Sequence, residues 1–429
     1  MSLFSAVKGA VVRRVVARSG GVDLTKLDRV PERLAWPLNR EGIDPTHRLT
    51  RSRDFDPVQR LASFLGLDIW LVTGYDEARA VLGDAGHSTD IRHLMGASGD
   101  LDGGDIGGLG FTDPPEHTRL RKLLTPEFTV RRLDRLRPGI AEIIEHQLDE
   151  TEATARRHRD VVDLAQTFAF PVPFRVICDL LGLPAEQREH FRALATSRFD
   201  VSRGGAGAVG AIGGSREFLL AETARQRHDP GPGLIGQILR EHGDEINDFD
   251  LGGLADGAFT GGLETSASML ALGTAVLLQH RELWKSLAVD PDSVAPVVEE
   301  LLRHLAVVQV AFPRFVREDT RIGRHLVEAG SVVLVHLPAA SRDPRSTPGD
   351  AFCPAADSSR HLAFGHGLHR CVGAELARME LRAAFVALAT RFPDMELAVD
   401  PGDLHYHPKS LVYGVDSLPV RLHPATLLG

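Results

Sequence analysis

The sequence predicts a mainly helical protein with small β-sheets, an α+β chain built around one long central helix. Three observations support this class: long segments follow the helical period, β-like runs are short, and the two seldom alternate as βαβ units. The chain has 429 residues, 43% of them hydrophobic, which is enough to fill a large core. Its length alone allows two or three domains, but no Pro/Ser-rich linker or charge block divides it, so we expect one large domain.

The expected elements follow from these periodicities. Helices are predicted at residues 138–155, 174–181, 246–280, 294–304 and 373–391, and β-strands at 69–72, 321–322, 332–337 and 411–422. Asn247 is the expected N-cap of the long helix, with Asp248 and Asp250 in its first turn. Two glycine-rich segments, 96–110 with seven glycines and 202–215 with six, are expected to be loops.

Composition excludes several classes of function. The net charge is −9, which gives no support for nucleic-acid binding. Cys178, Cys353 and Cys371 are odd in number and widely spaced, which favours a reducing cytoplasm over a disulfide framework. Residues 1–21 are apolar and basic but lack an uninterrupted apolar stretch of spanning length, so we expect no transmembrane segment. The signal-peptide cleavage pattern is also missing. We expect an N-terminal arm that packs on its own protein or frays, and the alternative is a basic amphipathic helix that touches a membrane surface.

The middle of the long helix contains the sequence GGLETS, residues 261–266. Two adjacent glycines cost on the order of 2 kcal/mol relative to alanines in a helix. Glu264 and Thr265 stand among apolar neighbours, where acids and hydroxyls need partners. One interpretation is close helix–helix packing at Gly261 and Gly262 with Glu264 in an ion pair. The other is a groove in which a ligand approaches the glycines and the acid–alcohol pair moves protons.

The segment AFGHGLHRCVG, residues 363–373, combines three glycines, two histidines and one cysteine before a strongly amphipathic helix. A helix N-terminus stabilises a thiolate, so Cys371 could be a nucleophile, a zinc ligand or an iron ligand. Zinc could nominally recruit His361, His366 and His369, but the spacing matches no common zinc pattern. A nucleophile needs a base and an oxyanion hole, which the sequence does not identify.

Several charged pairs are spaced for contact along helices. Glu300 and Arg303 lie three residues apart, and His117 and Arg121 lie four apart, so each pair shares a helix face. Four cationic or donor groups could together bind a dianionic ligand, since arginine pairs bidentately with carboxylates. These groups are His117, Arg121, Arg314 and His369.

The motifs together resemble those of the cytochrome P450 family. The haem-binding loop of that family has the spacing F-x-x-G-x-[HR]-x-C-x-G, which Phe364, Gly367, His369, Cys371 and Gly373 match. GGLETS resembles its oxygen-activation motif, and Glu300-x-x-Arg303 resembles its buried ion pair. DPPEHTRLRKLL (113–124) and SRDP (341–344) resemble its soluble bacterial members, and the resemblance runs from about residue 70 to residue 422.

The resemblance implies a cytochrome P450 fold with residues 1–35 as a basic arm and residues 36–429 as the haem-thiolate catalytic domain. Cys371 would be the axial iron ligand, which favours O–O cleavage. Glu264 and Thr265 would deliver protons, and Glu300 and Arg303 would be structural. The resemblance also implies which residues bind the haem: His117, Arg121, Arg314, Phe364, Gly365, His369 and Gly373. An apolar substrate pocket would be lined by Gly257, Ala258, Gly261, Val308, Val310 and Leu411.

The implied activity is that of a cytoplasmic, monomeric monooxygenase containing haem b. It would use dioxygen and a hydrophobic substrate, with electrons from NAD(P)H through ferredoxin reductase and ferredoxin. The alternatives are a peroxide-driven peroxygenase and a non-catalytic haem-binding or gas-sensing protein. One departure from the family stands out: an arginine usually completes the network of the E-x-x-R pair where this chain has Ala351. Either Arg345 or Arg360 substitutes for it, or the network is incomplete.

Overall fold

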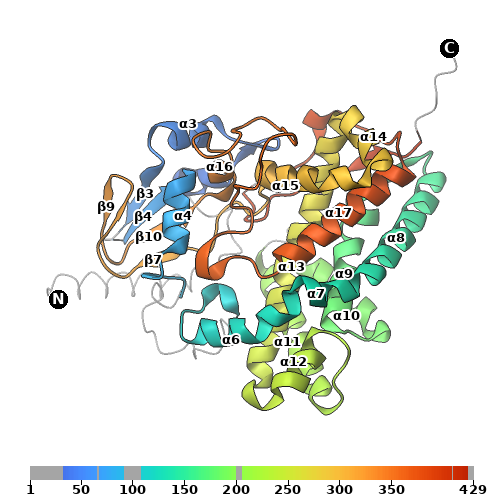
Figure 1. Ribbon diagram of the computed structural model, residues 1–429, viewed down its shortest axis with the longest axis horizontal. Coiled ribbons are helices and arrows are strands. Elements are labelled where there is room, and N and C mark those ends of the chain that lie inside the picture. Colours follow the sequence, from blue (N-terminus) through green and yellow to red (C-terminus); the bar gives the residue numbers. More distant parts are fainter. Residues whose placement is uncertain (1–31, 65–66, 91–107, 200–204, 408, 424–429) are drawn as a thin grey trace.

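The computed structural model describes residues 32–64, 67–90, 108–199, 205–407 and 409–423. Helices form one side of the molecule and a mixed sheet with its covering helices forms the other, as Figure 1 shows. The expected N-terminal arm, residues 1–35, lies almost wholly outside the described residues. The described part therefore shows the mainly helical α+β architecture that the sequence predicts, with strands confined to short segments.

The helical part contains all five segments that the periodicity predicts, each with its ends shifted by a few residues at most. These helices are α8 (Arg137–Arg157), α9 (Pro171–Leu181), α13 (Asp248–Gln279), α15 (Val294–Leu305) and α17 (Ala374–Arg391). The other main helices are α3 (His47–Phe55), α4 (Tyr75–Gly83), α6 (Glu116–Leu124), α7 (Val130–Leu133), α10 (Ala185–Phe199), α11 (Gly205–His228), α12 (Leu234–His242), α14 (Arg281–Val289) and α16 (Leu337–Ser341).

Helix α13 runs through the middle of the helical part (Figure 1). Asn247 caps it, as expected: the Asn247 side chain accepts a hydrogen bond of 2.7 Å from the Asp250 N–H. The helix packs against α9, α11, α15 and α17. By length and composition α13 could cross a membrane, but 72% of its most apolar window is buried inside the protein, as in the core helix of a soluble protein. Among the described residues it is the one helix that meets those criteria.

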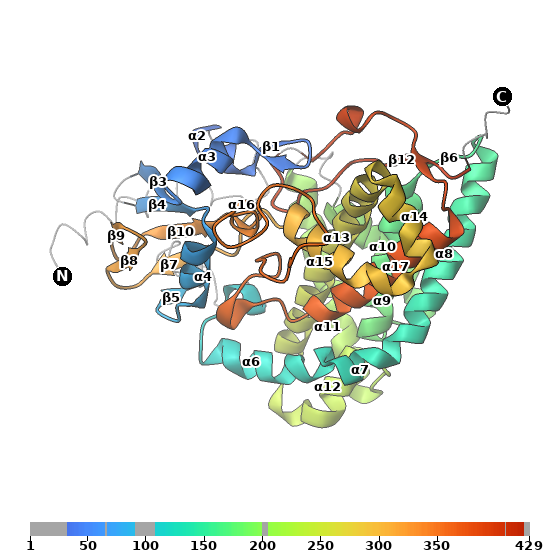
Figure 2. The same ribbon diagram turned by 45° about the horizontal axis from the view of Figure 1, so that its top comes forward.

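The largest sheet has the strand order β3-β4-β10-β7-β5, and Figure 2 shows it beside α3 and α4. Its central strand β10 (Val332–Val335) pairs in parallel with β4 (Leu67–Val72), in the register Val332 to Ile69. It pairs antiparallel with β7 (Arg314–Val316), and the edges are β3 (Val58–Phe64) and β5 (His87–Ser88). The sheet thus joins segments from both ends of the chain, which local sequence pattern cannot reveal.

The remaining strands form three small antiparallel sheets. They are β1 (Arg40–Glu41) with β2 (Asp44–Pro45), β8 (Thr320–Ile322) with β9 (His325–Val327), and β12 (Pro419–Arg421) between β6 (Val161–Asp163) and β11 (Glu396–Leu397). The predicted strand at residues 332–337 is shorter than expected, because α16 begins at Leu337.

The expectation of two glycine-rich loops is partly wrong. Residues 205–215, the larger part of the second segment, lie within α11, which packs against α10 and α13. Tertiary packing here overrides the low helix propensity of glycine. Of the first segment, residues 96–107 lie outside the described residues. Its last residues, 109–111, form a short 3-10 helix, η3 (Leu109–Phe111).

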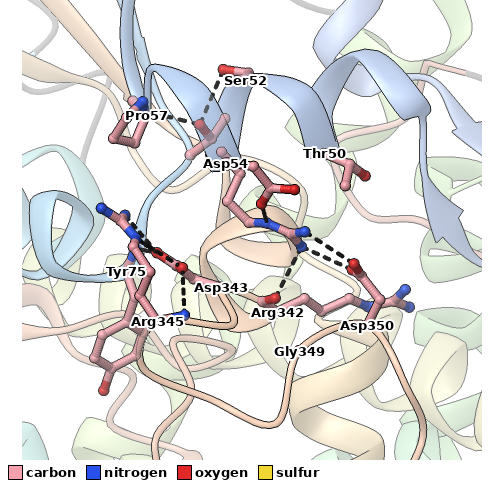
Figure 3. Close-up of polar contacts among 12 residues, drawn as sticks. Thr50, Ser52, Asp54, Pro57, Tyr75, Arg342, Asp343, Arg345, Gly349 and Asp350 are labelled. Carbon is pink, nitrogen blue, oxygen red and sulfur yellow. Dashed lines mark hydrogen bonds and ion pairs between the residues drawn. The ribbon is translucent and has the colours of Figure 1, made fainter.

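A polar network fastens α3 to the loop that follows α16 (Figure 3). The buried Arg53 forms a bidentate ion pair with Asp350 at 2.8 and 3.0 Å and also donates to the Arg342 carbonyl. Asp343 accepts hydrogen bonds from Arg345 and from the Tyr75 N–H, which starts α4. The N-terminal part of the fold therefore holds in place the chain that leads into the cysteine loop.

Candidate functional site

The cysteine loop is shaped by two glycines in the left-handed region. Gly365 has φ of 68° and Gly367 has φ of 71°. A Cβ at Gly367 would lie 2.5 Å from the Leu82 carbonyl oxygen, so the loop packs directly on the end of α4. The Cys371 N–H donates to the Phe364 carbonyl at 2.8 Å, which closes the loop. Cys371 therefore stands three residues before α17, as the sequence predicts.

Cys371 is accessible to solvent, yet burial within the surrounding protein raises the pKa of its thiol. The Gly373 N–H, which donates to the sulfur, and the charges of Arg121 and Arg370 oppose the effect of burial. The protein by itself thus favours the neutral thiol, not the thiolate expected at a helix start. A cation bound to the sulfur would supply the missing positive charge.

The predicted donors do converge. The rings of His117, in α6, and His369, in the 3-10 helix η10 (Gly367–His369), lie 4.3 Å apart between centroids. His117 is fully buried, and neither of its ring nitrogens has a hydrogen-bond partner among the described residues. Arg314, in β7, is also buried, and within the same part of the chain its side chain donates only to the Phe312 carbonyl, at 2.7 Å. These groups form a donor-rich site, although their residues are more than 250 positions apart at the extremes.

Burial lowers the pKa of each of the four donor side chains in this site. It lowers the pKa of His369 to about 4, helped by His117 and Arg314, and lowers the pKa of Arg314 to about 10. Burial and the neighbouring Arg121 lower the pKa of His117. Arg121 is half-buried, and burial lowers its pKa while the Cys371 side chain acts in the opposite direction. An anion bound at this site would stabilise the cationic forms of these side chains and so oppose the effect of burial on their pKa values.

Two further residues of this site were not predicted from the sequence. The Thr89 hydroxyl shares a hydrogen bond of 3.3 Å with His369 Nε2. Asp113 accepts hydrogen bonds from the Thr89 N–H, at 2.9 Å, and from Ser88, and also pairs with Arg317. Asp113 is the first residue of the DPPEH segment, so its position next to His117 could have drawn attention to it.

The residues present fit a haem group. A buried arginine and a histidine with two unpartnered nitrogens suit the two carboxylates of haem, and an accessible sulfur lies near Arg121. The zinc alternative is not formed: in the described ranges no three His, Cys, Asp or Glu side chains are placed to share a metal ion. Haem iron needs only one protein ligand here, which Cys371 can provide.

The middle of α13 has an open face. Gly257 and Gly261, one turn apart, are exposed, and a Cβ on either glycine would meet no atom within 4 Å. Gly262 faces the other way, since a Cβ there would lie 2.7 Å from Ile177 of α9. Close helix packing is therefore found at Gly262 and open space at Gly261, while proton movement by Glu264 and Thr265 stays a prediction. Thr265 follows on the open face, half-exposed, and donates to the Gly261 carbonyl at 2.6 Å.

Most of the other residues expected to line the pocket come from two neighbouring segments. Val308 pairs with Val412 and the Gln309 N–H donates to the Leu411 carbonyl at 2.9 Å, so the two segments lie side by side. Val308 and Val310 flank the buried Gln309 and share the opposite face. Leu411 is 48% exposed, whereas Ala258 is partly buried against the main core.

An aromatic pair next to these segments was missed by the sequence reasoning. Phe312 is 46% exposed and meets Phe111 of η3 edge-on, with 4.8 Å between ring centroids. Its position two residues before Arg314, in the sequence FPRF, was the available signal. The pair connects η3 to the segment between α15 and β7.

The buried Glu300–Arg303 pair finds its hydrogen-bond partners although position 351 is an alanine. Glu300 and Arg303 are fully buried and joined by two hydrogen bonds of 2.6 and 2.8 Å. Glu300 also accepts from the Cys353 N–H at 2.6 Å and from the Ser358 hydroxyl at 2.5 Å. Arg303 donates to the Ala351 carbonyl at 2.7 Å and to two other carbonyls.

Neither arginine considered from the sequence takes the missing place. Arg345 pairs with Asp343 and Glu77, and Arg360 lies over the ring of Tyr75. The network is complete because a hydroxyl and a backbone amide replace the guanidinium.

Two of the basic residues near the cysteine loop are neutralised. Arg119 forms ion pairs with Glu116 and Asp250. Arg378 binds Glu299 at 2.6 Å and Glu375 at 2.9 Å, and only 13% of its side chain is exposed. Lys122 and Arg370 are exposed.

Known proteins share this sequence and fold over nearly their whole length. The sequence profile described as Cytochrome P450 matches residues 234–403. Cytochrome P450 165C4 of Amycolatopsis orientalis is 37% identical over 405 residues, 92% of this chain and 98% of its own. The 6-deoxyerythronolide B hydroxylase of Saccharopolyspora erythraea is 36% identical over 377 residues, 84% of this chain and 91% of its own. The structure of OxyE, a cytochrome P450 involved in teicoplanin biosynthesis, matches with a TM-score of 0.82 at 34% identity, covering 90% of this chain and 99% of OxyE.

Similarity of this extent is not confined to the short motifs. It covers 92% of this chain in sequence and 90% in structure. The related proteins are named as cytochromes P450 and hydroxylases, and the family uses haem iron and dioxygen. The chain therefore belongs to the cytochrome P450 family and is an oxidoreductase of the monooxygenase type.

Proposed function

We propose that residues 36–429 form a haem-thiolate monooxygenase that inserts one oxygen atom of dioxygen into a hydrophobic small molecule. The observation that carries this proposal is Thr265, a half-exposed hydroxyl on the open face of a helix that is otherwise largely buried. A hydroxyl in that position can accept a hydrogen bond from a ligand beside Gly261, and it would donate its own proton to that ligand after rotating away from the Gly261 carbonyl. A protein that only carries haem needs no such group.

Haem bound here would supply the activation of dioxygen and the transfer of an oxygen atom to carbon. Cys371 would hold the iron through its sulfur, to which the Gly373 N–H donates. Phe364 and Gly365 would shape the loop beneath it. A hydrogen bond to the sulfur tunes such a ligand by withdrawing electron density from it.

The four donors would bind the two carboxylates of haem. Arg314 and Arg121 would offer charged hydrogen bonds, and neutral His117 would donate one hydrogen bond from the ring nitrogen that carries its proton. His369 would be held in orientation by Thr89. Glu264, half-buried beside Thr265, would relay protons to the Thr265 hydroxyl from the helix surface. Glu300 and Arg303 would keep the chain before the cysteine loop in place.

The substrate wall is mainly apolar, which suits hydrophobic small molecules. Gly257 and Gly261 contribute no side chain, so the site would have room above α13, and Ala258 would border it from its position against the core. Val308, Val310 and Leu411 would form the opposite wall. Terpenoids, steroids, fatty acids and polyketides are the substrate classes to screen. Antibiotic precursors should be added to the screen, because the names of two similar proteins refer to 6-deoxyerythronolide B and to teicoplanin biosynthesis.

Electrons would come from NAD(P)H through a ferredoxin reductase and an acidic ferredoxin in the cytoplasm, with the enzyme acting as a monomer. Lys122 and Arg370 would steer the ferredoxin towards the cysteine loop, since clustered charge accelerates association at low salt.

Two measurements test the proposal. Reduced protein under carbon monoxide should give the strongly red-shifted Soret band of thiolate-bound haem. A substrate found by displacement of iron-bound water should then be oxidised with NAD(P)H, ferredoxin and reductase. Product formed with hydrogen peroxide alone, but not with the ferredoxin system, would identify a peroxygenase. A red-shifted band without product from either system, across the substrate panel, would favour a haem-binding sensor.

A further inference from the structure

A second pocket opens on the outer side of the cysteine loop. It has a volume of about 260 Å³ and lies between the start of α4 and residues 359–370. Its lining is dominated by cationic and donor side chains, and its apolar contribution comes mainly from Leu362 and Phe364. The lining side chains that carry the argument are Tyr75, Arg79, Arg360, His366 and Arg370.

Three arginines of this pocket have no carboxylate partner. Arg79, Arg360 and Arg370 are exposed, and none of them forms an ion pair or a side-chain hydrogen bond within the described part of the chain. A fourth arginine of the lining, Arg378, is neutralised by Glu299 and Glu375. The pocket therefore concentrates unbalanced positive charge on a protein whose net charge is −9.

The three arginines line the same pocket and share neighbours within it. Arg79 and Arg360 lie over the ring of Tyr75, at 5.9 and 5.6 Å from its centroid. Burial, followed by the charges of Arg79 and Arg370, lowers the pKa of His366, so His366 lies near both arginines. Tyr75 is itself buried, and its N–H donates to Asp343 at 2.8 Å (Figure 3). A fixed aromatic ring thus anchors two of the three cations.

Nearby acids do not cancel this charge. Glu299 is committed to Arg378 and to His361. Asp357 is held by hydrogen bonds from Ser359, which lower its pKa, and the charge of Arg360 adds a smaller effect of the same sign. Asp357 therefore offsets part of the charge of Arg360, but it does not offset the charges of Arg79 and Arg370.

We propose that this pocket is an oxyanion site for a phosphate monoester or free phosphate. Arginine binds phosphate with paired N–H donors, and the phosphate group is doubly charged with several acceptor oxygens near neutral pH. Three arginines supply more positive charge than a single carboxylate would use, and neutral His366 adds a further possible donor. A concave cationic pocket also focuses the field and raises the local concentration of anions.

The test is calorimetric titration of the haem-loaded protein in phosphate-free chloride buffer. Inorganic phosphate, glycerol phosphate and acetate are added in separate experiments to wild type, Arg79→Gln, Arg360→Gln and the control Arg51→Gln. Arg51 is an exposed arginine of α3 outside the pocket. Phosphate should bind wild type and Arg51→Gln equally and bind each pocket variant roughly tenfold or more weakly. Tighter binding of glycerol phosphate than of phosphate would assign the site to a monoester, and the reverse order to the free ion.

Three results would overturn the proposal. They are equal phosphate affinity in wild type and both pocket variants, acetate binding as tight as phosphate, and no phosphate binding by wild type. If phosphate does not bind but Arg79→Gln slows reduction by ferredoxin, the pocket is a contact for the electron donor instead. The red-shifted carbon monoxide band in each variant confirms that the fold and the haem are intact.

Discussion

The Thr265 hydroxyl donates a hydrogen bond to the Gly261 carbonyl oxygen, 2.6 Å away and one turn earlier in α13. The hydroxyl proton is used in this bond, and the hydroxyl oxygen can still accept a hydrogen bond from another group. Because a Cβ on Gly261 would meet no atom within 4 Å, the space beside Gly261, one turn before Thr265, is open. We therefore expect Thr265 to exchange protons with a ligand there by rotation of its hydroxyl, without any movement of the backbone.

Replacing Thr265 with alanine should separate electron consumption from product formation. Thr265→Ala should keep haem, substrate binding and the carbon monoxide spectrum, and should release more hydrogen peroxide per NAD(P)H. A positioned proton donor contributes about 10²–10⁴ in rate, and water in the groove replaces part of it, so product per electron should fall roughly tenfold or more. Thr265→Ser keeps the hydroxyl and is the matched control. If coupling in Thr265→Ala equals that of wild type, Thr265 has no part in proton delivery.

Retention of haem should depend on His117. His117→Phe keeps a ring in the buried position but removes both nitrogens that lack a partner in the described structure. Loss of a hydrogen bond to a charged group costs about 1.5–3 kcal/mol, so haem should dissociate roughly tenfold or more faster. The measurement is transfer of haem to an acceptor protein, with the exposed His146→Phe as control. Equal transfer rates for the two variants would remove His117 from the haem site.

Ser358 should be necessary for the buried network around Glu300. Ser358→Ala removes a hydrogen bond to a fully buried carboxylate, so the free energy of unfolding should fall by about 1–3 kcal/mol. Arg360→Gln, which changes an exposed arginine that was a candidate for the same role, should leave it within about 0.5 kcal/mol of wild type. Denaturant titration measures both. A larger loss in Arg360→Gln than in Ser358→Ala would reverse the assignment.

Glu380 should make stability depend on pH in an unusual direction. Burial raises the pKa of Glu380, in α17, to about 8, and one of its oxygens has no partner. The folded protein holds this proton more tightly than the unfolded chain, so Glu380 destabilises the fold increasingly as pH rises from about 4.5 to about 8. Glu380→Gln should therefore match wild type near pH 4.5 and exceed it above pH 8 by roughly 1 kcal/mol or more.

Thermal or denaturant unfolding at several pH values measures this difference. Glu375→Gln, a change of an exposed glutamate on the same helix, serves as the control and should not show the same rise. A constant difference between Glu380→Gln and wild type from pH 5 to pH 9 would show that Glu380 does not titrate in this range.

Reduction by ferredoxin should depend on Lys122. Lys122→Glu reverses an exposed charge on α6, beside the cysteine loop, and should slow reduction and flatten its dependence on ionic strength. Arg51→Glu, on α3, is the matched reversal at a distant surface and should change neither quantity. Stopped-flow reduction at several salt concentrations gives both values. Equal effects of the two reversals would mean that net charge, and not a docking face near Lys122, governs the rate.

The parts of the fold that the sequence predicted are those set by local pattern. The ends of α13 follow from a capping asparagine and a helical period, and Cys371 could be placed because glycines and an amphipathic helix surround it. Residues 205–215 were misjudged because packing of α11 against its neighbours outweighs glycine propensity. Thr89, Ser358 and the Phe111–Phe312 pair act through partners far away in sequence, which no local pattern encodes.

The placement of β10 at the centre of the large sheet affects how the protein can form during synthesis. β3 and β4 leave the ribosome early. The second edge of β4 stays unpaired until β10, which lies about 260 residues later in the sequence, has been synthesised. Until then the nascent chain presents an unpaired strand edge that can associate with other chains. The sheet, and with it Arg314 in β7, can be completed only when most of the polypeptide has been made. We therefore expect haem to be captured after translation, and growth temperature and translation rate to affect the yield of holoenzyme more than haem supply does.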